Sequence, residues 1–266
     1  MTTVHTLASG SSGNALVISC GETHLLLDAG ISCRRISSAL RELDLAPADL
    51  TAILITHTHT DHIAGLATLL KRCDAPILGT RQTLWTLADR LGICAGRLAS
   101  LEPGTPEVLG TCQISAFPTS HDAPGSCGYR IDTADGSVGV LTDSGFVTDE
   151  AAETLSGVDL AVLEANHDVE TLQSGPYPYY LKRRILGSGG HLCNEDAARF
   201  AVTLADSGTE EIILAHLSRE NNTPAMALRA VETALSAAGL APELSVAPRD
   251  TLGPAHILAG RHVCRK

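Results

Sequence analysis

Six short apolar runs in this chain end abruptly in a histidine or an acidic residue, and this pattern restricts the fold more than any other feature. The runs are LLLDAG, ILITHTHTDH, FPTSHD, GVLTDSG, VLEANHD and IILAHLS. A continuous apolar run of this length is typical of a strand buried on both faces. Functional groups in layered α/β folds gather where strands end, so the six ends are expected to converge on one site.

Helical patterns alternate with these strands. Helices are expected at 31–45, 62–72, 80–92, 194–208 and 224–239. Asn194 is the expected N-cap of the fourth, and Gly92 and Gly239 are expected to end the third and the fifth. The alternation predicts an α/β sandwich. Because no low-complexity stretch marks a linker, we expect a single domain over residues 1–266.

Composition limits where the protein acts. No run of about 18 uncharged apolar residues occurs, which argues against a membrane span, and the first residues do not have the pattern of a secretory signal. The eight scattered cysteines, without a C-x-x-C pair, are therefore expected to be reduced thiols in a cytoplasmic protein. A net charge of −11 disfavours non-specific nucleic-acid binding by the whole surface but leaves room for a local basic patch.

The stretch ITHTHTDHIAG, residues 55–65, crowds three histidines and a carboxylate. His57 and His59 are two residues apart, so in an extended segment both rings point to one side and can reach one ion. Asp61 and His62 follow at the expected turn into a helix and can reach a neighbouring ion. Such ligands suit zinc, manganese or iron. The alternative, that Asp61 only caps the helix, leaves the three histidines unexplained.

Four ligands from one loop cannot complete two coordination spheres, so other strand ends must supply more. His121, Asp143 and His216 are the natural candidates. Asp143 could serve as a bridge, because one carboxylate can use both of its oxygens. Taken singly, His121 or His216 would be interpreted as a hydrogen-bonded structural histidine; their order along the chain favours the metal site.

The H-x-H-x-D-H motif after an apolar strand resembles the signature of the metallo-β-lactamase superfamily. LLLDAG, SHD at 120–122, TDSG at 142–145 and AHLS at 215–218 resemble its other motifs, in the same order. This resemblance covers nearly the whole chain. It implies a four-layer αββα sandwich of the metallo-β-lactamase type, with two central sheets and a dinuclear site at their edge.

The resemblance also assigns roles to individual residues. It implies a first ion bound by His57, His59 and His121. It implies a second ion bound by Asp61, His62 and His216, with Asp143 between the two. Asp28 would order the motif loop through hydrogen bonds, or would alternatively be a turn residue before Gly30.

Three further stretches bear on the substrate, which the fold does not identify. In LASGSSGNA, residues 7–15, small residues allow backbone N–H groups to cradle a phosphate, although a flexible turn is the alternative. The candidate side chains there are Ser11, Ser12 and Asn14. The stretch HLSRENNTP offers donors for phosphate oxygens, although a hydrogen-bonded loop is the alternative. Its candidate side chains are Ser218, Arg219, Asn221 and Asn222.

The stretch GPYPYYLKRR, residues 175–184, concentrates rings and positive charge in a chain that is poor in aromatics and acidic overall. Rings can stack on bases and cations can bind phosphates, which predicts a grip on single-stranded or frayed nucleic acid. A solvated helix start with its tyrosines packed on the core is the alternative. The candidate contacts are Tyr177, Tyr179, Lys182, Arg183 and Arg184.

These three stretches, with EANHDVETL and GSGGHLCNEDAA, resemble the YycJ (WalJ) group of metallo-β-lactamase-fold proteins. The resemblance implies a 5′-to-3′ exonuclease acting on DNA, and RNA stays open as the substrate because no residue marks a reader of the 2′-hydroxyl. Our hypothesis is phosphodiester hydrolysis by a hydroxide that two divalent ions, Zn²⁺ or Mn²⁺, activate. Candidate catalytic residues are Asp61, His191 and His167, the two histidines as proton donors or phosphate contacts.

Two other functions stay open from the sequence. One is another hydrolase of the same fold, such as a thioesterase of the glyoxalase II kind or a lactamase. The other is a metal-stabilised nucleic-acid-binding module without turnover. Every expected ligand position is filled, which weighs against the second. Nothing in the sequence indicates protein partners.

Overall fold

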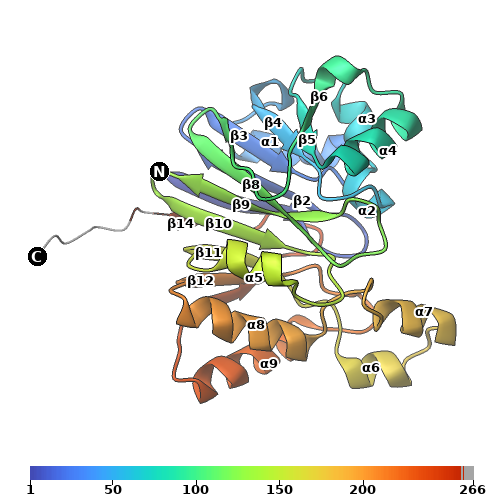
Figure 1. Cartoon of the computed structure of the whole chain (residues 1–266), viewed down its shortest axis with the longest axis vertical. Coiled ribbons are helices and arrows are strands. Elements are labelled where there is room, and N and C mark those ends of the chain that lie inside the picture. The colour runs from blue at the N-terminus through green and yellow to red at the C-terminus, as the bar shows by residue number, and fades with distance from the viewer. Residues whose placement is uncertain (259, 261–266) are drawn as a thin grey trace, which may run out of the picture.

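The computed structural model of the chain describes residues 1–258 and 260, so residues 259 and 261–266 of the predicted domain lie outside the described residues. Two seven-stranded sheets pack face to face (Figure 1). The strands of the first sheet are β1 (Thr2–Ala8), β2 (Ala15–Cys20), β3 (Thr23–Leu27), β4 (Ala52–Leu54), β5 (Ile77–Gly79), β6 (Leu98–Ser100) and β14 (His256–Leu258). Those of the second are β7 (Glu107–Leu109), β8 (Cys112–Pro118), β9 (Cys127–Thr133), β10 (Gly136–Leu141), β11 (Leu160–Glu164), β12 (Glu211–Ala215) and β13 (Glu243–Val246).

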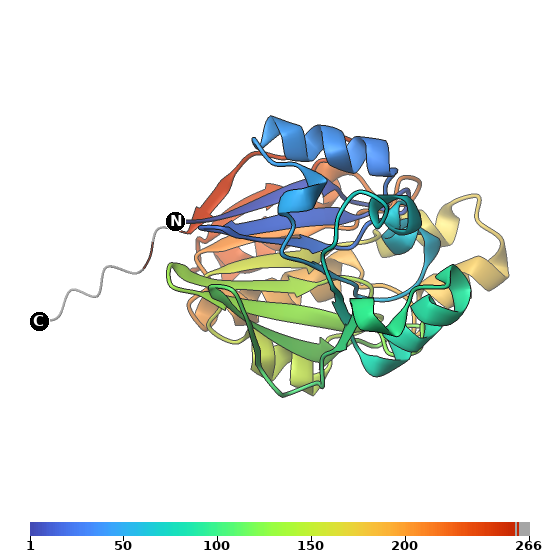
Figure 2. The same cartoon turned by 90° about the horizontal axis from the view of Figure 1, so that it is seen from above.

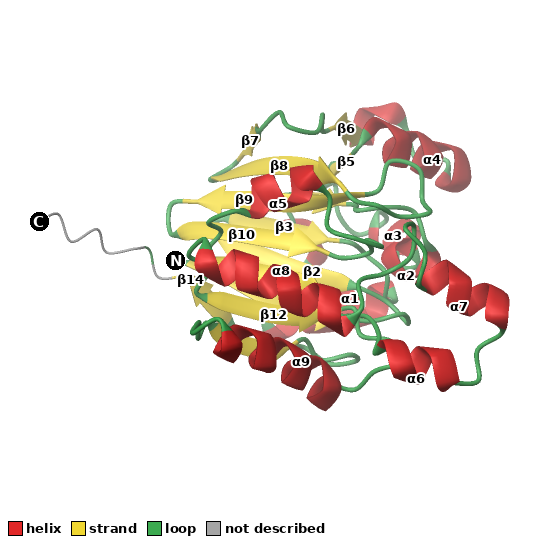
Figure 3. Cartoon of the chain, turned by 60° about the horizontal axis from the view of Figure 1, so that its bottom comes forward, coloured by secondary structure: helices red, strands yellow, loops and turns green. Residues whose placement is uncertain are grey.

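Helices cover the outer face of each sheet, and others lie at one end of the sandwich (Figure 1). They are α1 (Cys33–Glu42), α2 (Thr60–Ile63), α3 (Leu66–Leu69), α4 (Arg81–Leu91), α5 (Asp149–Leu155), α6 (Val169–Ser174), α7 (Tyr179–Ile185), α8 (Asn194–Asp206) and α9 (Pro224–Ala237). Helices α1, α3 and α4 pack on the first sheet, and α5, α8 and α9 on the second (Figures 2 and 3). The predicted four-layer αββα sandwich is thereby confirmed. Within the described residues, no helix is long and apolar enough to cross a membrane.

The apolar runs form strands because both faces of each run are buried. In β2, Leu16 and Ile18 face the opposite sheet, and Val17 between them packs under the outer helices. In β12, Ile213 faces the opposite sheet and Leu214 faces the helices. Alternate side chains therefore enter different apolar layers, which explains why these strands are apolar throughout rather than at every second residue.

Strand direction brings the six strand ends together. Strands β3 and β4 are parallel, and so are β10, β11 and β12, so their carboxyl ends lie on one edge of each sheet. Strand β8 pairs antiparallel with β9, which pairs antiparallel with β10, so β8 runs in the same direction as β10. The expected convergence of functional groups at one edge is a consequence of this topology.

Two local predictions are wrong. The helix expected at 62–72 is divided into α2 and α3 at Gly65. An added Cβ at Gly65 would lie 2.0 Å from the carbonyl oxygen of Ile31, so the chain is packed against the loop after β3. Helix α8 has Cys193 as its N-cap, and the side chain of Asn194 is instead hydrogen-bonded to Asn222. The predicted helix ends at Gly92 and Gly239 are confirmed.

Candidate metal centre

The loop after β4 carries four of the candidate ligands. His57 and His59 precede α2, and Asp61 and His62 lie inside this four-residue helix. The N-cap residue of α2 is His59, with extended backbone, so the alternative of Asp61 as the helix cap is wrong. All four side chains thus come from one short segment whose backbone changes from extended to helical.

Asp28, at the end of β3, holds this loop. Its Oδ1 accepts a hydrogen bond from the Thr56 backbone N–H at 2.9 Å, and its Oδ2 accepts one from the Thr56 hydroxyl at 2.9 Å. His62 Nδ1 lies 2.7 Å from the same Oδ2. Two residues on, an added Cβ at Gly30 would lie 1.6 Å from the Asp61 carbonyl oxygen, so only glycine allows this approach. Asp28 therefore connects both ends of the motif loop.

Three candidate site residues have left-handed backbone. The φ angles are 57° at Asp28, 57° at Asp143 and 55° at His216, and Asp44 is the fourth non-glycine residue with positive φ in the described chain. This conformation costs a non-glycine residue about 1 kcal/mol or more. Asp28, Asp143 and His216 follow the ends of β3, β10 and β12, where the chain turns sharply at the edge of the sheets. Strain of this kind is a feature of functional sites.

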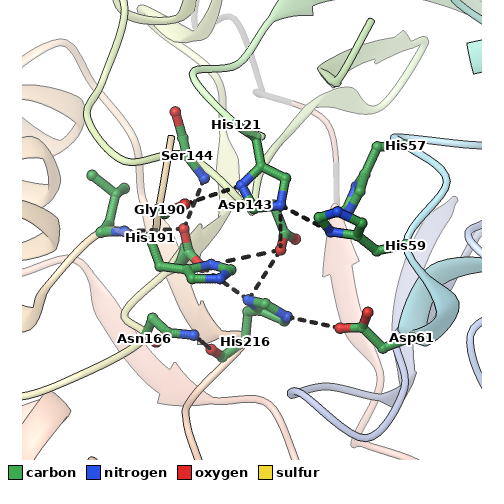
Figure 4. A network of polar contacts seen from close by, with 12 residues as sticks. His57, His59, Asp61, His121, Asp143, Ser144, Asn166, Gly190, His191 and His216 are labelled. Carbon is green, nitrogen blue, oxygen red and sulfur yellow. Dashed lines mark hydrogen bonds and ion pairs between the residues drawn. The ribbon is translucent and has the colours of Figure 1, made fainter. Parts of the chain in front are cut away.

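All seven predicted metal ligands lie together at this edge, and Figure 4 shows how most of them converge. Their ligand atoms form groups in which all atoms lie within 4.8 Å of one another. Three of these groups are His57, His59 and His121; Asp61, His62 and His216; and His57, His62 and Asp143. A fourth group joins Asp143 and His216 to Glu164 and His191. We call the first of these the first ligand group and the second the second ligand group.

Asp143 lies between the two ligand groups. Its Oδ2 is 3.3 Å from His62 Nε2, in the second group. Its Oδ1 is 3.8 Å from His121 Nε2, in the first group. The carboxylate is buried, with 3% of its side chain exposed, so both oxygens are directed into the centre rather than into solvent. This position suits a shared ligand.

Each of the five histidines has one ring nitrogen beside an acceptor outside the centre. These contacts are His57 Nδ1 to Thr56 Oγ1 (3.0 Å), His59 Nε2 to Asp122 Oδ1 (3.3 Å), His62 Nδ1 to Asp28 Oδ2 (2.7 Å), His121 Nδ1 to the Gly190 carbonyl oxygen (3.0 Å) and His216 Nδ1 to Glu164 Oε1 (2.8 Å). Such acceptors take the N–H of a neutral imidazole and leave the lone pair of the other nitrogen for the centre, as in metal sites.

Several buried atoms of the centre have no hydrogen-bond partner among the described residues. They are His57 Nε2, His216 Nε2 and Asp143 Oδ2. A buried polar atom without a partner costs about 1–3 kcal/mol. Cations held by the ligand groups would supply partners for these atoms, since nitrogen lone pairs and carboxylate oxygens are the ordinary ligands of such ions. The residues present therefore fit a divalent metal ion.

The electrostatics of the centre also favour a bound cation. Burial opposes charge on His62, but the carboxylates of Asp143 and Asp28 outweigh it and raise the pKa of His62 to about 9. Burial and the adjacent rings of His62 and His121 hold the pKa of His57 well below its usual range. The carboxylates of the centre thus require positive charge nearby, which a divalent ion supplies as well as a proton does.

Glu164 is a central residue that the sequence patterns did not single out. Its side chain is fully buried at the end of β11, and His191 Nδ1 and His216 Nδ1 each lie 2.8 Å from Oε1. Oε2 accepts hydrogen bonds from the backbone N–H groups of Ser144 and Leu192. Burial opposes its ionisation, but His191 and His216 keep the pKa of Glu164 well below its usual range. The run VLEANHD marked this strand end, and an acid closing a fully buried strand is the signal that could have found it.

The two candidate proton donors occupy different environments. His191 lies at the centre, with ring centroids 5.1 Å from His121 and 5.3 Å from His216, and 18% of its side chain is exposed. His167 is buried, and neither of its ring nitrogens has a hydrogen-bond partner within the described chain. Burial lowers the pKa of His167 to about 4, so its imidazole is neutral at pH 7. The two histidines therefore differ, because His191 lies among the candidate ligands whereas His167 is buried apart from hydrogen-bond partners in the described chain.

The loop of residues 7–15 places its candidate contacts differently. Ser11 and Ser12 are exposed at its turn. Asn14 is buried, and its Oδ1 accepts the Gly10 backbone N–H at 2.8 Å while its Nδ2 lies 3.0 Å from His62 Nε2. The contact of Ser11 and Ser12 with substrate stays a prediction, whereas Asn14 already uses its amide within the protein.

The residues after His216 form a hydrogen-bonded loop. Asn221 and Asn222 are buried. Asn222 Nδ2 donates to the carbonyl oxygen of Ala165 and to Asn194 Oδ1, both at 2.8 Å, and Ser218 Oγ accepts from the backbone N–H of Asn221. These contacts favour the structural alternative for Ser218, Asn221 and Asn222. Arg219 is different, because 67% of its side chain is exposed.

The stretch GPYPYYLKRR, residues 175–184, forms the loop after α6 and most of α7. Tyr179 and Tyr180 are 76% and 74% exposed, so the alternative in which they pack on the core is wrong, and Tyr177 is partly buried. Arg183 lies over the Tyr179 ring, 5.9 Å from its centroid. Lys182 donates to backbone carbonyls, and Arg184 pairs with Asp122. The cations of this stretch therefore have three different environments.

Comparison with known proteins agrees with this geometry. A family model described as the β-lactamase superfamily domain matches residues 23–217. Exodeoxyribonuclease WalJ of Streptococcus pneumoniae is 39% identical over 88% of each chain, and exodeoxyribonuclease YycJ of Bacillus anthracis is 36% identical over 88% of this chain and 89% of its own. The crystal structure of the metallo-β-lactamase-fold protein YhfI from Bacillus subtilis superposes with a TM-score of 0.72 and 18% identity, covering 96% of this chain and 99% of that one.

Proposed function

The chain belongs to the β-lactamase superfamily, and we propose that it is a metal-dependent phosphodiesterase, a 5′-to-3′ exonuclease that acts on DNA. The observation that carries this proposal is the cluster of five histidines with Asp61 and Asp143, in which every histidine has an acceptor on its outer side. Two relatives named exodeoxyribonucleases, similar over 88% of the chain, support the choice of DNA as substrate.

We assign two divalent ions, Zn²⁺ or Mn²⁺, to the centre. The first ligand group would hold one ion and the second ligand group the other, with Asp143 shared. Ions bound there would lower the pKa of a water molecule and polarise the phosphate. Asp28 and Glu164 hold His62 and His216 in the orientation that directs Nε2 into the centre. These two carboxylates thus prepare the second ligand group before any ion binds.

His191 is the residue that we assign as proton donor to the leaving oxygen. Glu164 Oε1 fixes the ring through Nδ1, which leaves Nε2 to face the substrate. The same oxygen contacts His216, so one buried carboxylate aligns the proton donor and a metal ligand together. We omit His167 from the reaction because its ring is buried and neutral.

The DNA strand would approach along the exposed rings of Tyr179 and Tyr180 and the guanidinium of Arg183. Stacking on exposed rings and cation contacts to phosphate are how proteins hold single strands without reading sequence. The net charge of −11 restricts this contact to a local footprint. Lys182 and Arg184, which bond within the protein, serve to shape this surface.

The decisive experiment uses metal-loaded protein with 5′-phosphorylated DNA, labelled at one end, alongside the matching RNA and a thioester. Asp61→Ala and His59→Ala should each lower DNA cleavage by more than about 100-fold, because each removes a metal ligand. Glu232→Ala, an exposed carboxylate on α9, is the matched control and should cleave normally. Circular dichroism checks that each variant is folded.

Three outcomes would contradict the proposal. Unchanged phosphodiesterase activity in both ligand variants would exclude the centre as the catalytic site. Faster cleavage of the thioester than of DNA would indicate a thioesterase of the same fold. Tight DNA binding with no product under Zn²⁺ or Mn²⁺ would indicate a binding module.

A further inference from the structure

Helices α6 and α7, with the loop between them, stand off the end of the sandwich at which α2 also lies (Figures 1 and 3). We call residues 169–185 the arm. Within it, Lys182 Nζ donates to the carbonyl oxygens of Gln173 and Gly175, both at 2.7 Å. This ammonium therefore ties α7 to the end of α6, and the arm is braced internally.

One side chain of the arm reaches the strand end after β8. Arg184 Nε donates to Asp122 Oδ2 at 2.5 Å, and Nη2 donates to Oδ1 at 3.2 Å. The contact is bidentate, which fixes the carboxylate in orientation as well as in position. Arg183, the preceding residue, points elsewhere and lies over the Tyr179 ring. The two adjacent arginines of α7 therefore have different partners, a ring within the arm for Arg183 and a carboxylate outside it for Arg184.

Asp122 also contacts the first ligand group. Its Oδ1 lies 3.3 Å from His59 Nε2, on the outer side of that ring, and 3.6 Å from His121 Nε2. The inner nitrogen, His59 Nδ1, lies 3.2 Å from His121 Nε2, so these two nitrogens converge on the position of one ion. The contacts form a chain from the arm to the candidate ligand, in the order Arg184, Asp122, His59.

The loop after the arm supports the same connection. Asp122 N–H donates to the Gly189 carbonyl at 3.1 Å, and His121 Nδ1 contacts the Gly190 carbonyl at 3.0 Å. The segment of residues 184–190 therefore orients two of the three histidines of the first ligand group. It contacts His121 directly through Gly190, and it holds Asp122, which contacts His59. The second ligand group has buried carboxylates from β3 and β11 instead.

We propose that Asp122 and Arg184 are positioning residues that couple the arm to metal binding by the first ligand group. The Asp122 carboxylate, 3.3 Å from His59 Nε2, favours a proton on that nitrogen and so keeps Nδ1 available to the ion, and Arg184 holds Asp122 in place. Any ligand that stabilises the arm in this position also favours ion binding, and the reverse holds by linkage. The identity of that ligand as a DNA strand rests on the proposed function; the positioning of His59 does not.

The first test measures metal retention without DNA. Wild type, Asp122→Asn, Arg184→Gln and the double variant are loaded with Zn²⁺ and titrated with a chelator, and the metal bound per chain is measured. Asp122→Asn should weaken retention of one ion about tenfold, and Arg184→Gln should weaken it by less. The double variant should match Asp122→Asn, because Arg184 acts through Asp122. Arg184→Lys should restore part of the loss.

A matched control separates positioning from general loss of charge or stability. Arg183→Gln removes a neighbouring cation from the same helix and should leave metal retention unchanged. Thermal unfolding of the metal-free variants should differ little from wild type, since an exposed ion pair contributes little to stability. Equal retention in Asp122→Asn and wild type, or additive losses in the double variant, would overturn the proposal.

The second test adds a phosphorothioate DNA strand that resists cleavage, at saturating concentration. The strand should strengthen retention of the same ion in wild type and in Arg229→Gln, which removes an exposed arginine on α9, and the gain should disappear in Arg184→Gln. No gain in wild type would overturn the coupling between arm and ion. Absence of DNA cleavage by metal-loaded wild type would instead contradict the proposed function, and the chelator titrations would still decide the positioning of His59.

Discussion

The two ligand groups of the metal centre differ in the groups that contact the outer ring nitrogens of their histidines. His62 and His216 contact the carboxylates of Asp28 and Glu164, of which 6% and 0% of the side chain is exposed. The histidines of the first ligand group contact a hydroxyl, a backbone carbonyl and Asp122, whose side chain is 37% exposed. A buried anionic acceptor makes an imidazole a stronger ligand than a neutral or solvated one does. We therefore expect the second ligand group to bind its ion more strongly than the first.

Within this comparison, we expect the largest effect from weakening a buried carboxylate that contacts the second ligand group. Glu164→Gln keeps the size of the side chain but removes the charge that pairs with His191 and His216. DNA cleavage should fall by about 10- to 100-fold, with loss of the second ion. Steady-state kinetics on end-labelled DNA and metal analysis would measure both.

The control for Glu164→Gln is a similar pair far from the centre. Glu211 contacts His256 between β12 and β14, so Glu211→Gln removes the same kind of carboxylate–histidine contact. This variant should keep its metal and its activity. If Glu164→Gln behaved in the same way, Glu164 would be a structural acid only.

A direct comparison of the two groups gives the next largest effect. Chelator titration of the wild-type protein should remove metal in two steps, and the ion of the first ligand group should leave at about tenfold lower chelator concentration. Asp28→Asn should bring the two steps together, because it weakens the contact behind His62. Loss of both ions in one step from wild type would show that the two groups do not differ.

The smallest effect concerns the exposed surface beside the first ligand group. Arg183→Ala removes an exposed cation that lies over the Tyr179 ring. DNA affinity should fall several-fold, and the slope of log affinity against log salt should decrease by about 1. Arg229→Ala, an exposed arginine on α9, should leave the slope unchanged. Fluorescence anisotropy with a labelled strand measures both quantities.

Sequence patterns predicted the parts of the site that are local in the chain. His57, His59, Asp61 and His62 lie within one loop, and apolar runs identified the strand ends that carry His121, Asp143 and His216. The layered fold followed from the same runs, since strands buried on both faces need helices outside them. The strand ends that carry the ligands converge because of strand direction, which the alternation of strands and helices already indicated.

Long-range pairing could not be predicted in the same way. Arg184 and Asp122 are 62 residues apart, and in the sequence both resemble solvated charges. Glu164 is separated from His216 by 52 residues, and an acid at a strand end is equally compatible with a turn. Lys182 resembled a phosphate contact, but the fold directs its ammonium to two carbonyl oxygens of the same segment. Partner identity of this kind depends on tertiary packing and is not encoded in spacing.

The left-handed backbone at Asp28, Asp143 and His216 has an evolutionary consequence. Glycine adopts this conformation without the steric penalty that a side chain carries, so Asp143→Gly would relieve strain and remove a buried charge at once. Selection for thermal stability alone would favour such replacements. A laboratory evolution experiment that rewards only folding should therefore produce a robust protein that has lost candidate metal ligands.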